Sequence, residues 1–162
     1  MIEVLYEDNH IIAVNKKSGD IVQGDKTGDK PLGEFVKDYL REKYNKPGNV
    51  FCGVIHRLDR PVSGLVIFAK TGKALTRMNE LFRNKTIQKT YWAVVENAPP
   101  KNEDTIINYL RKTESRNKSH AYNSPTDGFK ESELRYRVMG QSNNYTFVEV
   151  YPKTGRHHQI RV

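Results

Sequence analysis

The segment from His56 to Gly64 constrains the fold of this chain more than any other stretch. It reads His-Arg-Leu-Asp-Arg-Pro-Val-Ser-Gly, and the apolar run Leu65–Ala69 follows it immediately. Pro61 has no backbone N–H to give to a strand and restricts the residue before it to an extended conformation. Ser-Gly is typical of a turn, and the apolar run is typical of a buried strand. We therefore expect a short, stiff loop that presents Asp59 at the entrance to a core strand.

Two arginines, Arg57 and Arg60, lie close to Asp59 in this segment. A guanidinium that faces the carboxylate would favour its ionised form. Taken alone, an aspartate beside arginines at a strand entrance is most often a surface ion pair. A catalytic interpretation therefore depends on partners elsewhere in the chain.

Strand and helix periodicities alternate along the 162 residues, and the strands are more numerous. Alternating apolar residues and turn signals predict hairpins over residues 2–14 and 131–151. Further strands are predicted over residues 65–70, 87–96 and 105–110. We expect an α+β fold in a single domain over residues 1–162, with a mixed, largely antiparallel sheet and flanking helices.

Two helices are predicted from apolar residues at helical spacing. The first covers residues 31–44, with Pro31 at its first position and Asp29 as the better cap candidate. The second follows Thr71, which can cap it. Its apolar stripe is interpreted as core packing and consists of Ala74, Leu75, Met78, Leu81 and Phe82. Its outer face carries four basic residues, Lys73, Arg77, Arg83 and Lys85.

The charge balance is strongly basic, with 27 Lys and Arg against 19 Asp and Glu and a net charge of +8. Such a balance suits a polyanion, and nucleic acid is the commonest candidate, although a general solubility charge is an alternative. The single cysteine, Cys52, excludes an internal disulfide and favours a reducing compartment. No apolar run approaches membrane-spanning length. We expect a cytoplasmic protein without membrane association, and we predict no protein partner.

The segment Arg111–His120 contains four Lys or Arg residues, one Glu and one His, and no apolar residue. A solvated hairpin tip and an arm that touches phosphates explain this composition equally well. The sequence leaves both interpretations open.

Other chemistries find less support in the residues. The pair His157–His158 suggests a metal site, but adjacent side chains diverge and no third ligand pattern accompanies them. Ser63 with His56 and Asp59 suggests a hydrolase, but the G-x-S-x-G turn of a serine nucleophile is not present. No glycine-rich phosphate loop occurs. The remaining candidate is a site without a metal or nucleotide cofactor, made of an acidic residue, arginines and a strand that contains tyrosine.

Three ordered motifs resemble the RluA family of pseudouridine synthases. They are His56–Asp59 with Ser63–Gly64, then Lys89–Tyr91, then Thr154–Val162. The opening Tyr6–Lys16 is similar to that family as well. Two departures are Val62, where the family usually has Thr, and Lys17, where it usually has Pro. The family's catalytic domain normally continues beyond the last motif, so we expect this chain to be a truncated form of that domain.

The resemblance implies a catalytic set of Asp59, Tyr91 and Arg161. It implies that Asp59 acts as nucleophile or base, that Arg161 pairs with it, and that Tyr91 lies against the uracil near C5. It also implies that Arg57 fills the gap left by a flipped base. The expected RNA-binding residues are His56, Arg57, Arg60, Arg156, His158 and Gln159. No metal and no organic cofactor are expected.

The implied function is the isomerisation of uridine to pseudouridine in structured rRNA or tRNA, with flipping of the target base. The main alternative is a non-catalytic RNA-binding module with a trimmed synthase fold. A hydrolase built on Ser63 and His56 is a distant third hypothesis.

Overall fold

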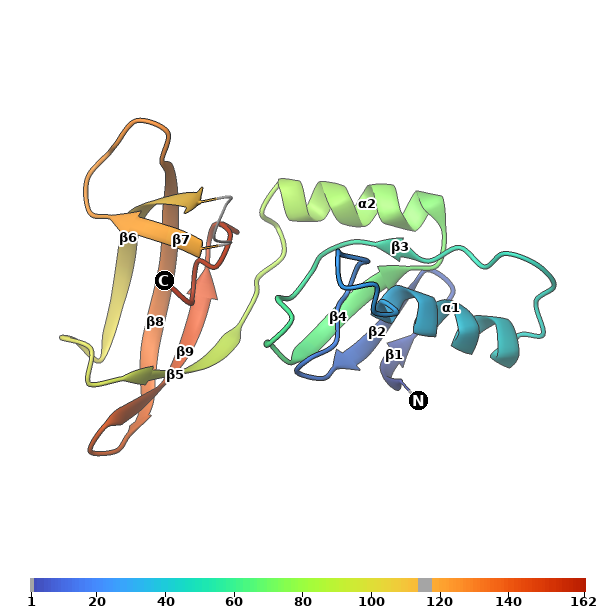
Figure 1. The fold of residues 1–162 in the computed structure, drawn as a ribbon, viewed down its shortest axis with the longest axis horizontal. Helices are drawn as coiled ribbons and strands as arrows, with labels where there is room; N and C mark the ends of the chain where they lie inside the picture. Colours follow the sequence, from blue (N-terminus) through green and yellow to red (C-terminus); the bar gives the residue numbers. More distant parts are fainter. Residues whose placement is uncertain (1, 114–117) are drawn as a thin grey trace. The chain divides into compact units, whose positions relative to one another are not determined.

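The computed structural model describes residues 2–113 and 118–162, which form two compact units, Met1–Thr86 and Ile87–Val162. Each unit has its own sheet, and both helices belong to the first unit (Figure 1). All strand pairs of the described residues are antiparallel. The expected α+β class is confirmed, with its strands distributed over two sheets. A single domain over residues 1–162 stays a prediction.

The first unit contains a four-stranded sheet in the order β1-β2-β4-β3. Its strands are β1 (Glu3–Glu7), β2 (Ile11–Lys16), β3 (Gly53–Val54) and β4 (Gly64–Ala69). The Asp8 carboxylate accepts hydrogen bonds at 2.7 Å from the backbone N–H groups of His10 and Ile11. These bonds hold the turn between β1 and β2, and the predicted hairpin is confirmed.

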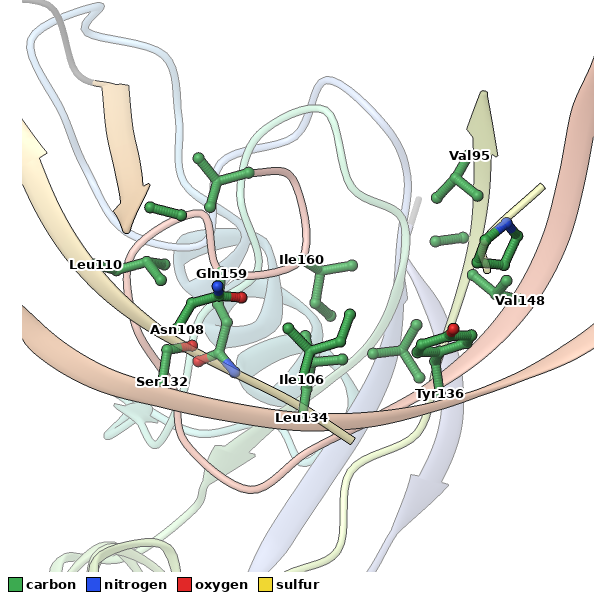
Figure 2. Close-up of a pocket in the computed structure, with 15 residues that line it drawn as sticks. Val95, Ile106, Asn108, Leu110, Ser132, Leu134, Tyr136, Val148, Gln159 and Ile160 are labelled. Carbon is green, nitrogen blue, oxygen red and sulfur yellow. The ribbon is translucent and has the colours of Figure 1, made fainter. Parts of the chain in front are cut away.

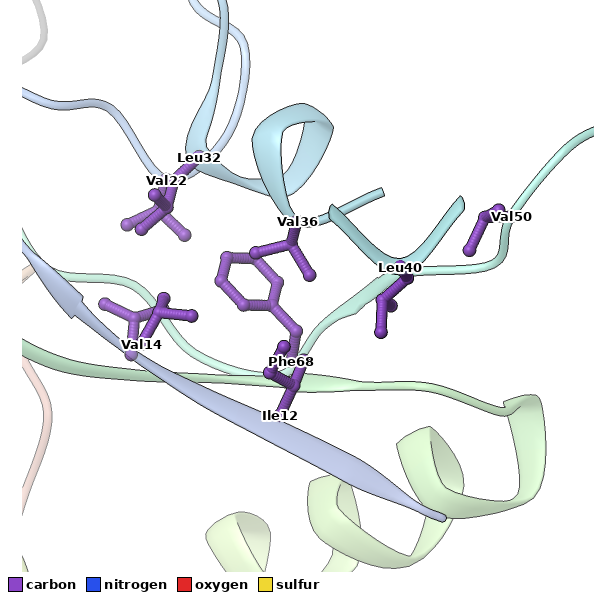
Figure 3. Packing of buried hydrophobic residues seen from close by; sticks show 9 residues of the cluster. Ile12, Val14, Val22, Leu32, Val36, Leu40, Val50 and Phe68 are labelled. Atoms are coloured by element: carbon purple, nitrogen blue, oxygen red, sulfur yellow. The ribbon is translucent and has the colours of Figure 1, made fainter. Parts of the chain in front are cut away.

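Helix α1 (Leu32–Lys43) covers one face of this sheet and closes the core of the first unit (Figure 3). Val36 and Leu40 of the helix pack with Phe68 of β4, and all three side chains are fully buried. From β2, Ile12 and Val14 join the same cluster because alternate residues of a strand point to one face. This packing anchors β4, which follows the Asp59 segment, and β2, which pairs with β4.

The start of α1 differs from the prediction. Pro31 is the N-cap and makes no side-chain cap hydrogen bond, so the expected cap at Asp29 is wrong. The Asp29 carboxylate instead forms an ion pair with Arg60 at 2.7 Å. The first helical N–H, that of Leu32, donates to the carbonyl of Ile21 at 2.7 Å. A backbone carbonyl of the preceding loop therefore satisfies one of the N–H groups that have no acceptor within the helix.

Helix α2 (Gly72–Arg83) begins as predicted, because the Thr71 hydroxyl accepts a hydrogen bond from the N–H of Ala74 at 3.1 Å. Its apolar stripe is packed only in part. Ala74 is the one buried residue of the helix, and the side chain of Leu81 is 41% exposed. The helix lies against β4 and the two-residue strand β3, which is too short to cover a stripe of three turns.

The second unit is a five-stranded sheet in the order β5-β9-β8-β6-β7. Its strands are β5 (Tyr91–Glu96), β6 (Glu103–Thr113), β7 (Lys118–Tyr122), β8 (Lys130–Gln141) and β9 (Tyr145–Pro152). The predicted hairpin of β8 and β9 is confirmed. Strand β6 is longer than predicted because its charged ends also pair, with β8 at one end and with β7 at the other. Strand β5 is shorter than predicted and begins where its ladder with β9 begins, at Tyr91.

One face of the second sheet is apolar and borders a cavity of about 220 Å³ (Figure 2). Val95, Leu134 and Val148 from three neighbouring strands line it, and Ile160 approaches from the terminal segment. The cavity leaves these side chains with fewer packing partners than a filled core would give them.

Candidate functional site

The Asp59 segment lies between β3 and β4 of the first unit and is held by hydrogen bonds to its backbone. The carbonyl of Asp59 accepts from the N–H of Val62 at 3.0 Å, which forms a tight turn around Pro61. The Ser18 hydroxyl donates to the Pro61 carbonyl at 3.0 Å, and the N–H of Gly19 donates to the Arg60 carbonyl at 2.9 Å. The half-buried Asp59 side chain therefore stands on a fixed loop, as the sequence predicts.

The main anchor of this loop is Lys16, which the sequence reasoning missed. Its side chain is fully buried, and its Nζ donates to the carbonyls of Lys17, Arg60 and Val62 at 3.0, 3.0 and 2.6 Å. Burial lowers the pKa of Lys16, while the nearby carboxylates of Asp20 and Asp59 act in the opposite direction. A signal was present in the sequence, because the two-residue period of β2 places Lys16 on the same inward face as Ile12 and Val14.

The two arginines of the segment are exposed and make bonds within the first unit. Arg60 pairs with Asp29 at 2.7 Å, and Arg57 makes a long contact of 3.5 Å to the side-chain oxygen of Gln23. Their exposure leaves the guanidinium groups accessible to a ligand. A direct effect of these arginines on Asp59 stays a prediction.

His56 is built into the packing of the first unit. Its Nε2 accepts a hydrogen bond from the backbone N–H of Ile67 at 3.1 Å, and its ring stacks on Phe82 with the centroids 5.2 Å apart. The ring thus joins the Asp59 segment to β4 and α2. Because Nε2 is an acceptor here, it is not available as a base for Ser63, which weakens the hydrolase hypothesis.

In the second unit, Tyr91 is the first residue of β5 and is half-buried. It lies opposite Val150 of β9 and packs against the cluster of Tyr136, Val148 and Val150. Just before it, Lys89 is partly buried, which lowers its pKa, and its Nζ lies 3.8 Å from the place where a Cβ on Gly155 would be. The Lys89–Tyr91 motif and the terminal motif are therefore neighbours in this unit.

The terminal segment is a compact loop that Gln159 organises. Its side-chain oxygen accepts from the Thr154 hydroxyl and from the N–H of Arg156, both at 2.9 Å, and its amide donates to the Glu133 carbonyl at 3.0 Å. The Thr154 hydroxyl also accepts from the N–H of Glu133 at 2.9 Å. Gln159 is buried and serves the loop's internal bonding, whereas the sequence suggested an RNA contact for it.

Arg161 and the histidine pair occupy the end of this loop. Arg161 Nη1 lies 3.0 Å from His158 Nε2. The rings of His157 and His158 stack with centroids 3.7 Å apart, so the expectation that these adjacent side chains diverge is wrong, because His158 has a positive φ and belongs to neither a helix nor a strand. The Ser119 hydroxyl of β7 lies 2.7 Å from the His157 carbonyl and 2.8 Å from its Nδ1, so this buried serine ties the loop to the sheet. Ser119 has no signal in the sequence, since it lies 38 residues from its partner.

Arg156 lies at the start of the loop with its guanidinium exposed, and its Nε donates to the Glu131 carbonyl at 2.7 Å. The structure brings Tyr91, Arg156, His158, Gln159 and Arg161 into the second unit, and it places Asp59 in the first. The pairing of Asp59 with Arg161 stays a prediction.

Two further findings concern the described residues only. No three His, Cys, Asp or Glu side chains gather there in a way that could hold a metal ion. Neither of the two described helices is long and apolar enough to cross a membrane.

The predicted basic segment Arg111–His120 falls partly on residues 114–117, which lie outside the described residues.

Comparison with known proteins adds the following findings. Residues 10–162 match the family described as RNA pseudouridylate synthase. Ribosomal large subunit pseudouridine synthase C of Buchnera aphidicola is 36% identical over 159 residues, which are 98% of this chain and 48% of that protein. The tRNA pseudouridine synthase C of Vibrio cholerae is 30% identical over 172 residues, which cover 99% of this chain and 68% of that protein.

A solved human structure, RNA pseudouridylate synthase domain containing 4, shares the fold. Its TM-score is 0.82 at 20% identity, and the match covers 99% of this chain and 62% of that one. The chain spans about half the length of the ribosomal synthases that it matches.

Proposed function

Because the chain belongs to the RNA pseudouridylate synthase family and has the α+β fold of these enzymes, we propose that it isomerises uridine to pseudouridine in rRNA or tRNA. One observation carries the proposal: the family match runs from residue 10 to residue 162 and so includes all three motifs in order. The relatives named as synthases of rRNA and of tRNA support both RNA classes as substrates.

In the proposed reaction the N1–C1′ bond of uridine breaks, the uracil turns, and a C5–C1′ bond forms. Asp59 acts as nucleophile or base, and its fixed loop supports this role because a catalytic carboxylate must be held in place. Arg161 is proposed to keep the carboxylate ionised, and Tyr91 to lie against the uracil. The proton at C5 of the turned base leaves after the new bond has formed.

Recognition of the RNA is proposed to use the exposed guanidinium groups of Arg57, Arg60 and Arg156, together with His56 and His158. Arginine pairs with phosphate in a planar, two-point geometry and also stacks on bases. Extrusion of the target base costs a few kcal/mol, which contacts to the flanking phosphates can offset. For Gln159 we propose only a supporting role, because its polar atoms hold the terminal loop.

The test uses the full 162-residue chain with unmodified rRNA and tRNA transcripts whose uridines carry tritium at C5. Conversion releases tritium to water, and reverse-transcription mapping then locates the site. We expect release with the unsubstituted chain and none with Asp59→Asn, whereas the affinity for RNA changes less than a few-fold. Binding without release from any transcript would favour the RNA-binding module, and neither binding nor release would contradict both hypotheses.

A further inference from the structure

Strands β6 and β7 present a basic and aromatic surface on the side of the sheet away from the cavity. In their ladder Arg111 lies opposite His120, and Thr113 lies opposite Lys118. Residues that pair directly in an antiparallel ladder share a face, and alternate residues point to the other face. Leu110 and Ala121 line the cavity, so their neighbours Arg111 and His120 point away from it.

Aromatic rings complete this surface. The Arg111 guanidinium lies 5.4 Å from the centre of the Phe129 ring, and the Tyr122 ring meets Phe129 edge to face with centroids 4.7 Å apart. The Tyr122 side chain is 51% exposed. We call this surface the β6–β7 face and define it by Arg111, Lys118, His120, Tyr122 and Phe129.

The charges of the β6–β7 face differ from those elsewhere on the same sheet. There Arg135 pairs with Glu103, and Arg137 pairs with Glu149, which also accepts a hydrogen bond from Trp92. In the part of the chain that the structure describes, no ion pair joins Arg111 or Lys118 to a carboxylate. Glu131 of β8 lies opposite Tyr109 and so shares this side of the sheet. With Arg111 and Lys118 the β6–β7 face still keeps a net positive charge next to an exposed ring.

We propose that the β6–β7 face binds unpaired nucleotides of the RNA substrate, an inference that rests on the proposed function. Arg111 and Lys118 contact phosphates, and Tyr122 stacks on a base while Phe129 and Arg111 hold its ring in place. Positive groups that follow the backbone, combined with rings that stack on bases, are the recurring elements of single-strand recognition. An acidic protein would also satisfy the charge, but it would not need the exposed ring.

The proposal predicts separable effects of charge and ring on binding to an oligouridine of about 12 nucleotides, a length within the usual single-strand site size. The double variant Arg111→Ala/Lys118→Ala is expected to bind about tenfold more weakly at low salt. Its log–log salt dependence is expected to be shallower by about 1.4, because each lost phosphate contact removes about 0.7. Tyr122→Leu keeps an apolar side chain but loses the ring, and its affinity for oligouridine is expected to fall about fivefold with no change in salt dependence.

The matched control is Arg137→Ala, which removes one positive charge from the same sheet but from an existing ion pair. It is expected to change oligouridine affinity less than about twofold. Circular dichroism spectra and thermal melts of each variant test whether it is folded. An unsubstituted chain that binds no oligouridine contradicts this inference, whereas the proposed function is tested separately by tritium release from the rRNA and tRNA transcripts.

Two further outcomes would overturn this inference alone. One is oligouridine affinity that stays within twofold of the unsubstituted chain in all β6–β7 variants. The other is an equal loss of affinity for polyglutamate in Tyr122→Leu, which would show that the face binds acidic chains without base stacking.

Discussion

Lys16 is the single residue on which the position of the Asp59 loop most depends. Replacement by Met keeps most of the buried volume but removes the Nζ donor from the carbonyls of Lys17, Arg60 and Val62. The Lys17 and Arg60 carbonyls keep a backbone N–H donor, whereas the Val62 carbonyl loses the shortest of the three bonds. Each unpaired buried carbonyl costs about 1–3 kcal/mol, partly offset because a buried ammonium is no longer desolvated. We expect Lys16→Met to lower the free energy of unfolding by about 2 kcal/mol and to reduce tritium release severely, as measured by denaturant titration and the C5 assay.

The neighbouring Lys17 provides the control for this variant. Its side chain is exposed, and only its backbone takes part in the loop. Lys17→Met is expected to change the free energy of unfolding by less than about 0.5 kcal/mol. Equal effects of the two substitutions would mean that Lys16 acts only through general charge.

Ser119 is expected to position the terminal loop that carries Arg161. Ser119→Ala removes the hydroxyl that contacts the carbonyl and Nδ1 of His157, and we expect a loss of about 1 kcal/mol in the free energy of unfolding. The maximal rate of the C5 assay should fall more than the affinity for RNA. Ser132→Ala, an equally buried serine on β8 that faces the cavity, is the control and should leave the rate unchanged.

Among the elements of the first unit, Glu7 connects β1 to α1 and β4. Its carboxylate accepts from Lys43 at 2.7 Å, from Lys70 at 2.6 Å and from the Tyr44 hydroxyl at 2.7 Å. Burial by itself would raise the pKa of Glu7, but the bonds from Lys43, Lys70 and Tyr44 lower it from 4.5 to about 2. Because the folded state holds the charged form, this stabilisation is complete above pH 4.5 and is lost as the pH falls towards 2.

The prediction for this junction is a change in acid stability. Glu7→Gln should lower the free energy of unfolding by about 2–4 kcal/mol near neutral pH, because Lys70 then remains buried without its partner. Its unfolding curve should also depend less on pH between 4.5 and 2 than that of the unsubstituted chain. The control is Glu42→Gln, an exposed position on α1. A parallel decline of the Glu7→Gln and unsubstituted curves with acid would refute the role of Glu7.

Elements with strong local signals could be predicted from the sequence. The hairpins of β1–β2 and β8–β9 and the cap at Thr71 follow from alternation, turn residues and a single hydroxyl. The cap at Asp29 failed because a distant arginine, Arg60, binds that carboxylate. The prediction that the whole apolar stripe of α2 packs in the core was wrong in part. Periodicity indicates which residues share a face of the helix, but it does not indicate how much surface the facing strand covers.

The candidate site shows the same division between local and distant information. The motifs identified Asp59 and the stiffness of its loop, which depends on Pro61 and the turn after it. The anchors Lys16 and Ser119 bind partners 46 and 38 residues away in the sequence, and no pattern of neighbouring residues indicates those partners. Lys16 was detectable only as a charged residue in phase with a buried strand face.

At the scale of the whole molecule, the positive charge is spread over both units, in each of which basic residues outnumber acidic ones. Part of this charge is neutralised internally, as in the pairs Lys70–Glu7 and Arg137–Glu149. The positive charges outside these ion pairs include that of Arg57, which is proposed to bind RNA. Binding of RNA should therefore be governed by the release of counterions.

This argument predicts how the affinity of the full chain for RNA depends on salt. With about four phosphates neutralised, the log–log slope for single strands is about −3, which corresponds to a loss of roughly 60-fold between 50 and 200 mM salt. Anisotropy titrations with oligouridine in potassium chloride measure the slope. A thermal melt over the same salt range is the control and should shift little, because buried pairs such as Lys70–Glu7 are weakly screened. A slope near zero with an unchanged melt would contradict an electrostatic mode of RNA binding.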